Sequence, residues 1–509
     1  MEQSLALEIM LSGENVFLTG PAGSGKTFIL NEFIRLARKQ GKSVSVTATT
    51  GLAATHLNGN TIHAWSGMGI LDELPPRYVE YLPKGRRDTI ANADVLIIDE
   101  VSMLHDYRLD MVDQITRAVR SEDKPFGGVQ VILCGDFFQL PPVNRSDNRQ
   151  GSFVVNSAAW RNLNPVVCYL IEQHRQNDDA FLDILNALRA SDIRRRHVDQ
   201  LLSRQNAELD HDDVITELHT TNVDVDSIND RQLKLIEGKE HVFRMETTGK
   251  ANYVDTLKRS CLAVEELVLK KGALVMCIRN SQDKKYVNGS LGVVVDFHPG
   301  TGWPLVELRN GKELLIGPEA WELRDGDKKR ASITQIPLRL AWAITVHKSQ
   351  GMTLDAARID LRKAFVEGMG YVALSRVRGL DTLSLAGINN MALRVSPEAI
   401  LIDRELQQRA LADIKRFEHL AAQAKKRNES PEPKEKAKKS SNWTEKLVKM
   451  REEYPKAYMS WSEAENDKLK RLFEKDKGVT ELTTVFQRHP GAIRARLKKI
   501  YGDDVEMKK

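Results

Sequence analysis

The sequence predicts an α/β fold built on two parallel β-sheets, with a small antiparallel β insertion and a separate all-α segment near the C-terminus. Short apolar runs alternate with helical stretches over most of the chain, as in parallel sheets whose strands are buried on both faces. One stretch in the second half changes to a hairpin-like pattern. A charge-rich stretch then separates the last helical segment from the rest.

The first α/β unit is predicted at residues 1–160. Its strands are nearly uniformly apolar runs at residues 16–18, 44–46, 95–98 and 129–133. A second unit is predicted at residues 161–283 and 334–395, with runs at 166–170, 214–218, 273–278, 336–341 and 383–386. Short runs rich in Val and Ile indicate buried strands, and the helical stretches between them favour parallel pairing.

Residues 284–333 interrupt the second unit and are predicted to form a small antiparallel barrel. Asn288-Gly289 stands beside a strand there and is a hairpin turn signal. A long helix is predicted at 396–427 and a linker at 428–441. Between residues 425 and 439 the chain carries seven basic residues, three acidic residues and two prolines, a composition typical of solvated linkers.

Three short helices are predicted within residues 442–503. Ser462 and Glu465 have the spacing of a capping box at the start of the first helix. The third helix, at 491–500, carries the basic residues Arg494, Arg496, Lys498 and Lys499. The segment resembles a Myb/SANT-like helix-turn-helix, whose third helix would contact duplex or junction DNA. A basic solvated helix or a protein-docking module fits it about equally well.

The composition is that of a folded globular protein, with 509 residues, 41% hydrophobic and 28% charged. No apolar run approaches the ~18 residues that span a bilayer, and we expect no signal peptide. The scattered Cys134, Cys168, Cys261 and Cys277 fit neither a zinc site nor a disulfide framework, so we expect free thiols in the cytoplasm. The net charge of +5 alone says little about partners.

A phosphate-binding loop of the form G-x-x-x-x-G-K-[ST] is the strongest functional motif. It reads Gly20-Pro21-Ala22-Gly23-Ser24-Gly25-Lys26-Thr27. The loop follows a strand and opens a helix, which is the context that the motif requires. Its backbone N–H groups and the helix N-terminus would surround phosphate groups. Lys26 would reach the β- and γ-phosphates of ATP, and Thr27 would hold Mg²⁺.

Two adjacent carboxylates, Asp99 and Glu100, end a strand that follows the loop in chain order. Asp99 would bind the magnesium ion, and Glu100 would orient and deprotonate the attacking water. An acidic pair at a strand end is common, and its position after the phosphate loop gives it weight. Together the two motifs predict a nucleoside-triphosphate hydrolase rather than a kinase.

Three more residues are candidates for sensing the γ-phosphate. Gln139 follows a third strand, although a surface glutamine before a Pro-Pro turn fits that position as well. Arg175 and Arg376 lie in the second unit, and an arginine supplied from a facing domain would stabilise charge in the transition state. Most arginines are surface residues, so either one alone is a weak indicator.

The order of these motifs resembles the petite-integration-frequency (PIF) family of superfamily 1 DNA helicases, which is related to RecD. The resemblance covers about residues 1 to 395. Gln3 stands where the family's glutamine reads adenine. Besides the loop and the acidic pair, the resemblance rests on residues 47–54, 61–65, 107–128, 135–143, 340–351 and 371–376.

The resemblance implies two RecA-like domains with ATP between them, an SH3-like barrel at 284–333, a small wedge near 66–92 and 5′-to-3′ polarity. It implies nucleotide contacts from Gln3, Gly20, Ala22, Gly23, Ser24, Gly25, Lys26, Thr27 and Phe28. It implies grip on the strand through phosphate contacts and base stacking, from Thr50, His63, His347, Lys348 and Ser349. Histidines buried in their own cores are the alternative for His63 and His347.

We therefore expect an ATP-dependent DNA helicase that uses Mg²⁺ and acts on single-stranded DNA and single/double-strand junctions. A DNA-stimulated ATPase that remodels protein–DNA complexes without separating strands has the same motifs and is the main alternative. An ATP-regulated DNA-binding protein is a third, against which the full hydrolytic set argues. In one departure from the family pattern Met369 follows Gly368, where the family often has glutamine, so a polar contact near the nucleotide is expected to be missing.

Overall fold

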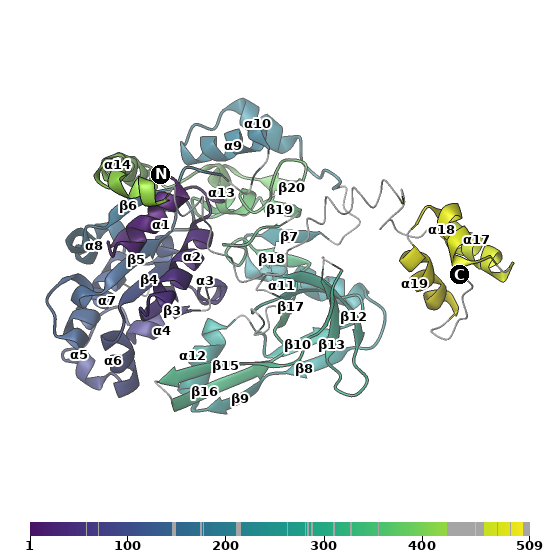
Figure 1. The fold of residues 1–509 in the computed structure, drawn as a ribbon, viewed down its shortest axis with the longest axis horizontal. Helices are drawn as coiled ribbons and strands as arrows, with labels where there is room; N and C mark the ends of the chain where they lie inside the picture. The colour runs from purple at the N-terminus through teal and green to yellow at the C-terminus, as the bar shows by residue number, and fades with distance from the viewer. Residues whose placement is uncertain are drawn as a thin grey trace. The chain divides into compact units, whose positions relative to one another are not determined.

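The chain forms two compact units in the computed structural model, Met1–Asn428 and Glu429–Lys509, whose helices and strands are drawn in Figure 1. The structure describes residues 1–424, 454 and 463–501, except for 58, 70, 145–148, 174–175, 177, 210–214, 262, 280, 282–284, 287–288, 309–310, 326–327, 355, 476 and 489. Among the described residues, no helix is both long and apolar enough to cross a membrane.

Six parallel strands form the first sheet, in the order β3-β2-β4-β5-β1-β6. They are β1 (Val16–Thr19), β2 (Val44–Ala48), β3 (Asn60–Thr61), β4 (Val95–Asp99), β5 (Gln130–Cys134) and β6 (Val166–Tyr169). Around them lie α1 (Gln3–Leu11), α2 (Lys26–Lys39), α3 (Gly51–His56), α4 (Ile62–Ser66), α5 (Tyr78–Tyr81), α6 (Lys84–Ala91), η1 (Val101–Met103), α7 (Asp106–Arg120), η2 (Pro125–Gly128), η3 (Val154–Asn156) and α8 (Ala158–Leu163). We call this sheet and its helices the first lobe.

One predicted strand belongs to a different sheet. The run at 166–170 was expected to begin the second unit, but β6 pairs in parallel with β1 at the edge of the first sheet. That prediction is wrong. An apolar run indicates that a strand is buried, but it does not indicate which sheet the strand joins.

Four parallel strands form the second sheet, in the order β18-β7-β19-β20. They are β7 (Thr216–His219), β18 (Ala343–Thr345), β19 (Ala357–Leu361) and β20 (Leu383–Ile388). We call this sheet the second lobe, together with α9 (Asp179–Arg189), α10 (Arg195–Leu202), α11 (Asn222–Leu235), α13 (Met369–Leu374) and η4 (Asn390–Leu393). β18 follows β7 by more than a hundred residues, so a large segment is inserted between neighbouring strands.

That inserted segment is antiparallel and larger than predicted. One sheet has the order β14-β13-β12-β11-β17, with β11 (Leu274–Cys277), β12 (Leu291–Phe297), β13 (Pro304–Leu308), β14 (Glu313–Leu315) and β17 (Leu338–Leu340). Next to it in the chain are β9 (Glu246–Gly249), β15 (Glu319–Asp325) and β16 (Lys328–Gln335) in a second sheet, β8 (His241–Arg244) paired with β10 (Glu266–Leu269), and α12 (Ala251–Ser260).

The runs at 273–278 and 336–341 were expected to be strands of the second parallel sheet, and this is wrong. β11 and β17 pair antiparallel with each other, and β11 also pairs antiparallel with β12. All four residues of β11 are buried. A strand that is covered on both faces carries an unbroken apolar run in either kind of sheet, so the run alone did not reveal the direction of pairing.

The helix α14 (Pro397–Arg416) leaves the second lobe and packs on the first. In Figure 1 it lies beside α1 and β6. Asp413 accepts a hydrogen bond from the backbone N–H of Val167 at 2.8 Å, and Arg409 donates to the carbonyl of Pro165 at 2.8 Å. α14 ends before Phe417, and η5 (Glu418–Leu420) follows, so the long helix predicted at 396–427 is interrupted.

The second compact unit contains α17 (Glu463–Glu474), α18 (Val479–Phe486) and α19 (Pro490–Tyr501). The third of these, α19, extends one residue beyond each end of the helix predicted at 491–500. Their common core consists of Leu469, Val479, Leu482, Phe486, Ile493 and Leu497. The linker predicted at 428–441 and the capping residue Ser462 lie outside the described residues.

Candidate active site

The phosphate loop joins β1 to α2 through backbone conformations that favour glycine. Gly20, Gly23 and Gly25 have φ angles of 146°, 88° and 83°. A Cβ on Gly20 would lie 2.6 Å from the carbonyl oxygen of Leu170, so a larger residue would displace the loop. The ammonium of Lys26 lies over the loop and donates to the carbonyl oxygens of Gly20 and Pro21 at 2.8 and 3.0 Å.

α1 and α2 place the other predicted nucleotide contacts around this loop. The side chain of Gln3 donates to the carbonyl oxygen of Ser24 at 3.0 Å. Phe28 is 60% exposed and lines the cleft in front of the loop. The hydroxyl of Ser24 is buried and finds no hydrogen-bond partner among the described residues. A buried hydroxyl of this kind fits a phosphate oxygen as its partner, because buried polar groups are otherwise satisfied.

The predicted acidic pair lies at the end of β4, beside the loop. Asp99 accepts a hydrogen bond from the backbone N–H of Glu100 at 2.9 Å, and Glu100 has a left-handed backbone with φ of 53°. Burial, and then the charge of Asp99, raises the pKa of Glu100 to about 7, against the opposing charges of Lys26 and Arg376. A carboxylate in this range can accept a proton near neutral pH.

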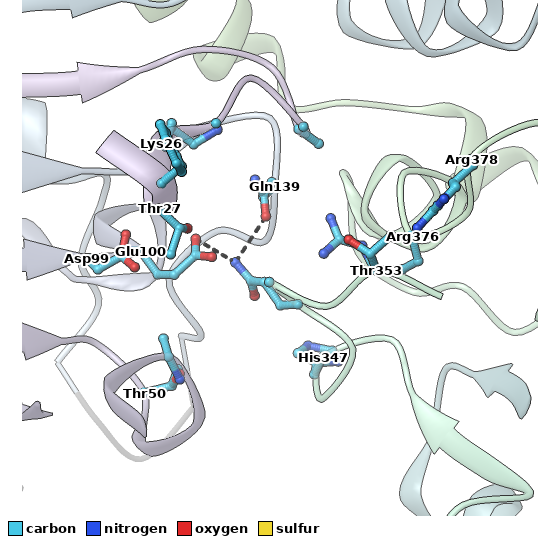
Figure 2. Close-up of a pocket in the computed structure, with 17 residues that line it drawn as sticks. Lys26, Thr27, Thr50, Asp99, Glu100, Gln139, His347, Thr353, Arg376 and Arg378 are labelled. Carbon is cyan, nitrogen blue, oxygen red and sulfur yellow. Dashed lines mark hydrogen bonds between the residues drawn. The ribbon is translucent and has the colours of Figure 1, made fainter. Parts of the chain in front are cut away.

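A residue of the second lobe contacts two of these groups, and sequence reasoning did not single it out. The side-chain amide of Gln350 donates to Glu100 at 3.0 Å and to Gln139 at 3.3 Å, as the dashed lines in Figure 2 show. Gln350 lies within the stretch 340–351 that carries the family resemblance. That stretch was the available signal, but nothing in it marked this glutamine as a partner of Glu100.

The two lobes enclose a cleft of about 490 Å³. Figure 2 shows Lys26, Thr27, Asp99, Glu100 and Gln139 on one side of it, and Thr353, Arg376 and Arg378 on the other. The full lining is Ala22, Gly23, Gly25, Lys26, Thr27, Phe28, Thr50, Ala53, Asp99, Glu100, Gln139, His347, Gln350, Gly351, Thr353, Arg376 and Arg378. Thr353 and Arg378 were not predicted as site residues.

The structure describes only one of the two predicted arginines. Arg376 lines the cleft from the second lobe, and it is held by hydrogen bonds to the carbonyl oxygens of Val372, Ser349 and Met352 at 2.8, 3.3 and 3.2 Å. Arg175 lies outside the described residues, so its role stays a prediction.

A buried charged cluster joins the lobes beside the phosphate loop. Arg189 of α9 pairs with both oxygens of Asp136 at 2.8 and 2.7 Å and donates to the hydroxyl of Tyr371 at 3.0 Å. That hydroxyl also accepts the backbone N–H of Ala22, within the phosphate loop, at 2.9 Å. Arg189 further donates to the hydroxyl of Tyr169 at 3.1 Å. We call Asp136, Arg189, Tyr371 and Tyr169 the charged seam.

The glycine before α13 explains how closely the lobes approach here. A Cβ on Gly368 would lie 2.7 Å from the carbonyl oxygens of both Phe138 and Gln139, and its φ is 82°. The next residue, Met369, is fully buried. In place of the polar contact that the family's glutamine would make, Met369 therefore packs into the hydrophobic core.

Two of the five predicted DNA contacts line the cleft. Thr50 and His347 line it from opposite lobes. Burial, then the charges of Arg108 and His105, lowers the pKa of His63 to about 4, so this side chain is neutral at physiological pH. The ammonium of Lys348 donates to Asn222 at 2.9 Å. Ser349 is fully buried, and its hydroxyl donates to the carbonyl of Val346 at 2.8 Å.

This placement of Ser349 differs from the expectation that its side chain contacts DNA. In this conformation no part of it is exposed to a strand, and its hydroxyl is already satisfied inside the loop. A serine within an apolar and basic motif gives no sign in the sequence of whether its hydroxyl points inward or outward, because both placements are common.

Comparisons with known protein sequences point to one family. Residues 2–196 match the family described as PIF1-like helicase, and residues 252–297 match the family described as DNA helicase Pif1, 2B domain. An ATP-dependent DNA helicase Pif1 of Psychrobacter sp. is 40% identical over 481 residues, which cover 82% of this chain and 73% of that protein.

Solved structures match as well. The Pif1 helicase of Candida albicans is 34% identical, with a TM-score of 0.71, over 79% of this chain and 98% of that one. The Pif1 helicase from Bacteroides in complex with ADP-AlF3 and ssDNA is 31% identical, with a TM-score of 0.63, over 81% and 98%. The predicted family is confirmed: the chain belongs to the PIF1-like helicase family.

Proposed function

We propose that ATP hydrolysis between the two lobes drives this protein 5′-to-3′ along single-stranded DNA and separates duplex or structured DNA ahead of it. The chain is an ATP-dependent DNA helicase, as predicted, because relatives of that name match most of its length. One observation carries the mechanism: a single cleft collects Lys26 and Glu100 from the first lobe, and Gln350 and Arg376 from the second. Hydrolysis there changes the contacts between the lobes, and this change moves the protein along the DNA strand.

Each side chain has a role that fits its position. Lys26 and the loop N–H groups bind the phosphates, and Thr27 with Asp99 would hold Mg²⁺, which supplies charge neutralisation to the transferred phosphoryl group. Glu100 takes the proton of the attacking water. Gln139 contacts the γ-phosphate, and Arg376 stabilises the charge that develops on it. We assign Arg175 the same role as Arg376 on the family resemblance.

We propose RecA-like domains for the two lobes and an SH3-like barrel for the sheet β14-β13-β12-β11-β17. For this barrel we propose bounds near residues 274 and 340 rather than 284 and 333, and the antiparallel pairing of β11 with β12 and β17 supports them. We also propose a wedge at 66–92. In support of it, Asp72 accepts hydrogen bonds from Tyr107 at 3.0 Å and Arg108 at 2.9 Å, which tie this segment to α7.

For the DNA strand we propose contacts from Thr50, His347 and Lys348, with His63 acting as a neutral partner. The Bacteroides relative has been solved with both ADP-AlF3 and ssDNA, which supports a strand held by the same two lobes that hold the nucleotide. Grip through the backbone and base faces carries no sequence information. Binding should therefore be similar for strands of any sequence. It should also weaken strongly as the salt concentration rises, because phosphate contacts release counterions.

Unwinding of forked duplexes tests the proposal. The protein is given ATP and a duplex with either a 5′ or a 3′ single-stranded tail, and Lys26→Ala serves as the inactive control. We expect separation of the 5′-tailed duplex by the natural protein only. DNA-stimulated ATPase activity without separation of either duplex would favour the protein–DNA remodelling alternative, and separation of the 3′-tailed duplex alone would reverse the polarity.

For the second compact unit we propose duplex or junction binding through α19, as in a Myb/SANT-like module. Arg494 of α19 is exposed, whereas Arg496 donates to Asn466 at 2.7 Å and Arg488 is buried against Glu465 at 3.0 Å. An exposed arginine on a short third helix can reach phosphates. Truncation after residue 425 should weaken junction binding without changing ATPase activity on single-stranded DNA. Unchanged affinity would favour the protein-docking alternative.

A further inference from the structure

One glutamine of the second lobe holds two groups of the first. The amide of Gln350 has two N–H donors, and they are directed at Glu100 and Gln139 at 3.0 and 3.3 Å. Gln350 is 7% exposed, so water competes little for these hydrogen bonds. The group assigned to deprotonate water and the group assigned to contact the γ-phosphate are thus joined through a residue of the opposite lobe. We call these three residues the amide bridge.

The loop that carries Gln350 is internally braced. The N–H of Ser349 donates to the carbonyl of Thr345 at 3.0 Å, and the N–H of Met352 donates to the carbonyl of Ser349 at 3.0 Å. The guanidinium of Arg376 donates to the carbonyls of Ser349 and Met352, on either side of Gln350. Gln350 and Arg376 are therefore fixed to the same short segment and move together when the lobes move.

The same segment carries two of the proposed DNA contacts. His347 lines the cleft, and Lys348 donates to Asn222 at the start of α11. Only one residue separates Lys348 from Gln350. A strand that binds His347 and Lys348 therefore acts directly on the segment whose amide holds Glu100, and no longer chain of contacts between the two sites is needed.

We propose that Gln350 is a positioning residue that orients the Glu100 carboxylate and transmits DNA binding to ATP hydrolysis. This inference rests on the proposed function. In the reaction, the water oxygen forms a bond to the γ-phosphorus and the bond from that phosphorus to the bridging oxygen of ADP breaks. The water proton goes to Glu100. Gln350 forms and breaks no covalent bond; it sets the direction in which the carboxylate faces.

The test compares ATP hydrolysis with and without a single-stranded oligothymidine in Gln350→Met, which keeps the length of the side chain and removes both donors. We expect the DNA-stimulated kcat to fall about ten- to a hundredfold, as for a misplaced catalytic group. The KM for ATP and the DNA-free rate should change far less, so the ratio of the two rates falls. A merely structural role would lower both rates together.

Two further variants keep the inference falsifiable if Gln350→Met folds poorly. Gln350→Asn retains the amide but is one methylene too short to bridge, and should reproduce the loss. Gln350→Glu places a carboxylate against Glu100 and should lose more. Gln40→Met, at an exposed position after α2, is the matched control, and fluorescent ADP binding checks that each variant is folded.

Two outcomes separate this inference from the proposed function. If the natural protein shows no DNA stimulation, the proposed function itself fails. If stimulation is present in the natural protein and the ratio of the two rates is the same in folded Gln350→Met or Gln350→Asn, Gln350 does not transmit DNA binding and the inference is overturned.

Discussion

The two lobes touch at two places that differ in chemistry. The charged seam contains an ion pair between Arg189 and Asp136 in which the arginine is 8% and the aspartate 1% exposed. The amide bridge consists of two hydrogen bonds from one neutral side chain that is 7% exposed and lines the cleft. Breaking a buried ion pair costs about 3–5 kcal/mol because each charge would lose its partner away from water, whereas one neutral hydrogen bond contributes about 1 kcal/mol. We expect the lobes to pivot at the seam and to open at the bridge.

The largest expected effect comes from Arg376→Ala, which removes a cation held against the segment that carries Gln350 and leaves the charged seam intact. An arginine that faces the transferred phosphate contributes about 10³-fold or more to turnover, so DNA-stimulated ATPase activity should fall by that amount while fluorescent ADP still binds. Arg376→Lys keeps the charge but not the forked donors and should recover only part of the rate. An unchanged rate in Arg376→Ala would exclude the role assigned to this residue.

Breaking the seam should have the next largest effect, and it should appear in stability. Arg189→Ala leaves Asp136 buried without its partner, which is expected to reduce the free energy of unfolding by about 3–5 kcal/mol. Urea denaturation measures this change. Arg194→Ala, which removes an exposed ion pair with Asp192, is the matched control and should leave the midpoint where it was. Equal midpoints for the two variants would mean that the seam does not hold the lobes.

The smallest effect is expected where the seam meets the phosphate loop. Tyr371→Phe removes the hydroxyl that accepts the N–H of Ala22. One such hydrogen bond contributes about 1 kcal/mol, so ADP should bind roughly fivefold more weakly in a fluorescence titration. Tyr81→Phe, at a side chain that is 78% exposed, is the control. If both variants bind ADP as the natural protein does, the seam does not shape the nucleotide site.

The parts of the site that lie close together in sequence were predictable. The phosphate loop and the Asp99-Glu100 pair each occupy one short stretch whose spacing and flanking strand define their geometry. The sheets of the two lobes were predictable as parallel and apolar. The sequence did not reveal which sheet each of β6, β11 and β17 joins. The length and composition of a buried strand are nearly the same in every sheet that could receive it.

Groups that meet across the lobes were not predictable from the sequence. Gln350 and Glu100 are separated by 250 residues, and Arg189 and Asp136 by 53. Arg189 ends α9, where a basic residue is expected simply because it interacts favourably with the helix dipole. Its burial depends on the approach of β6, α13 and α14 from three other parts of the chain. No local sequence pattern indicates that these three elements pack around Arg189.

The return of α14 to the first lobe also covers the β6 edge of the first sheet, and this should prevent self-association of the protein. β6 is the last strand of its sheet, and an edge strand with open N–H and C=O groups invites pairing with a second molecule. Asp413 and Arg409 occupy such groups at Val167 and Pro165. A version cut before Pro397 would uncover them and should self-associate, whereas one cut after residue 425 keeps the edge covered and should stay dispersed.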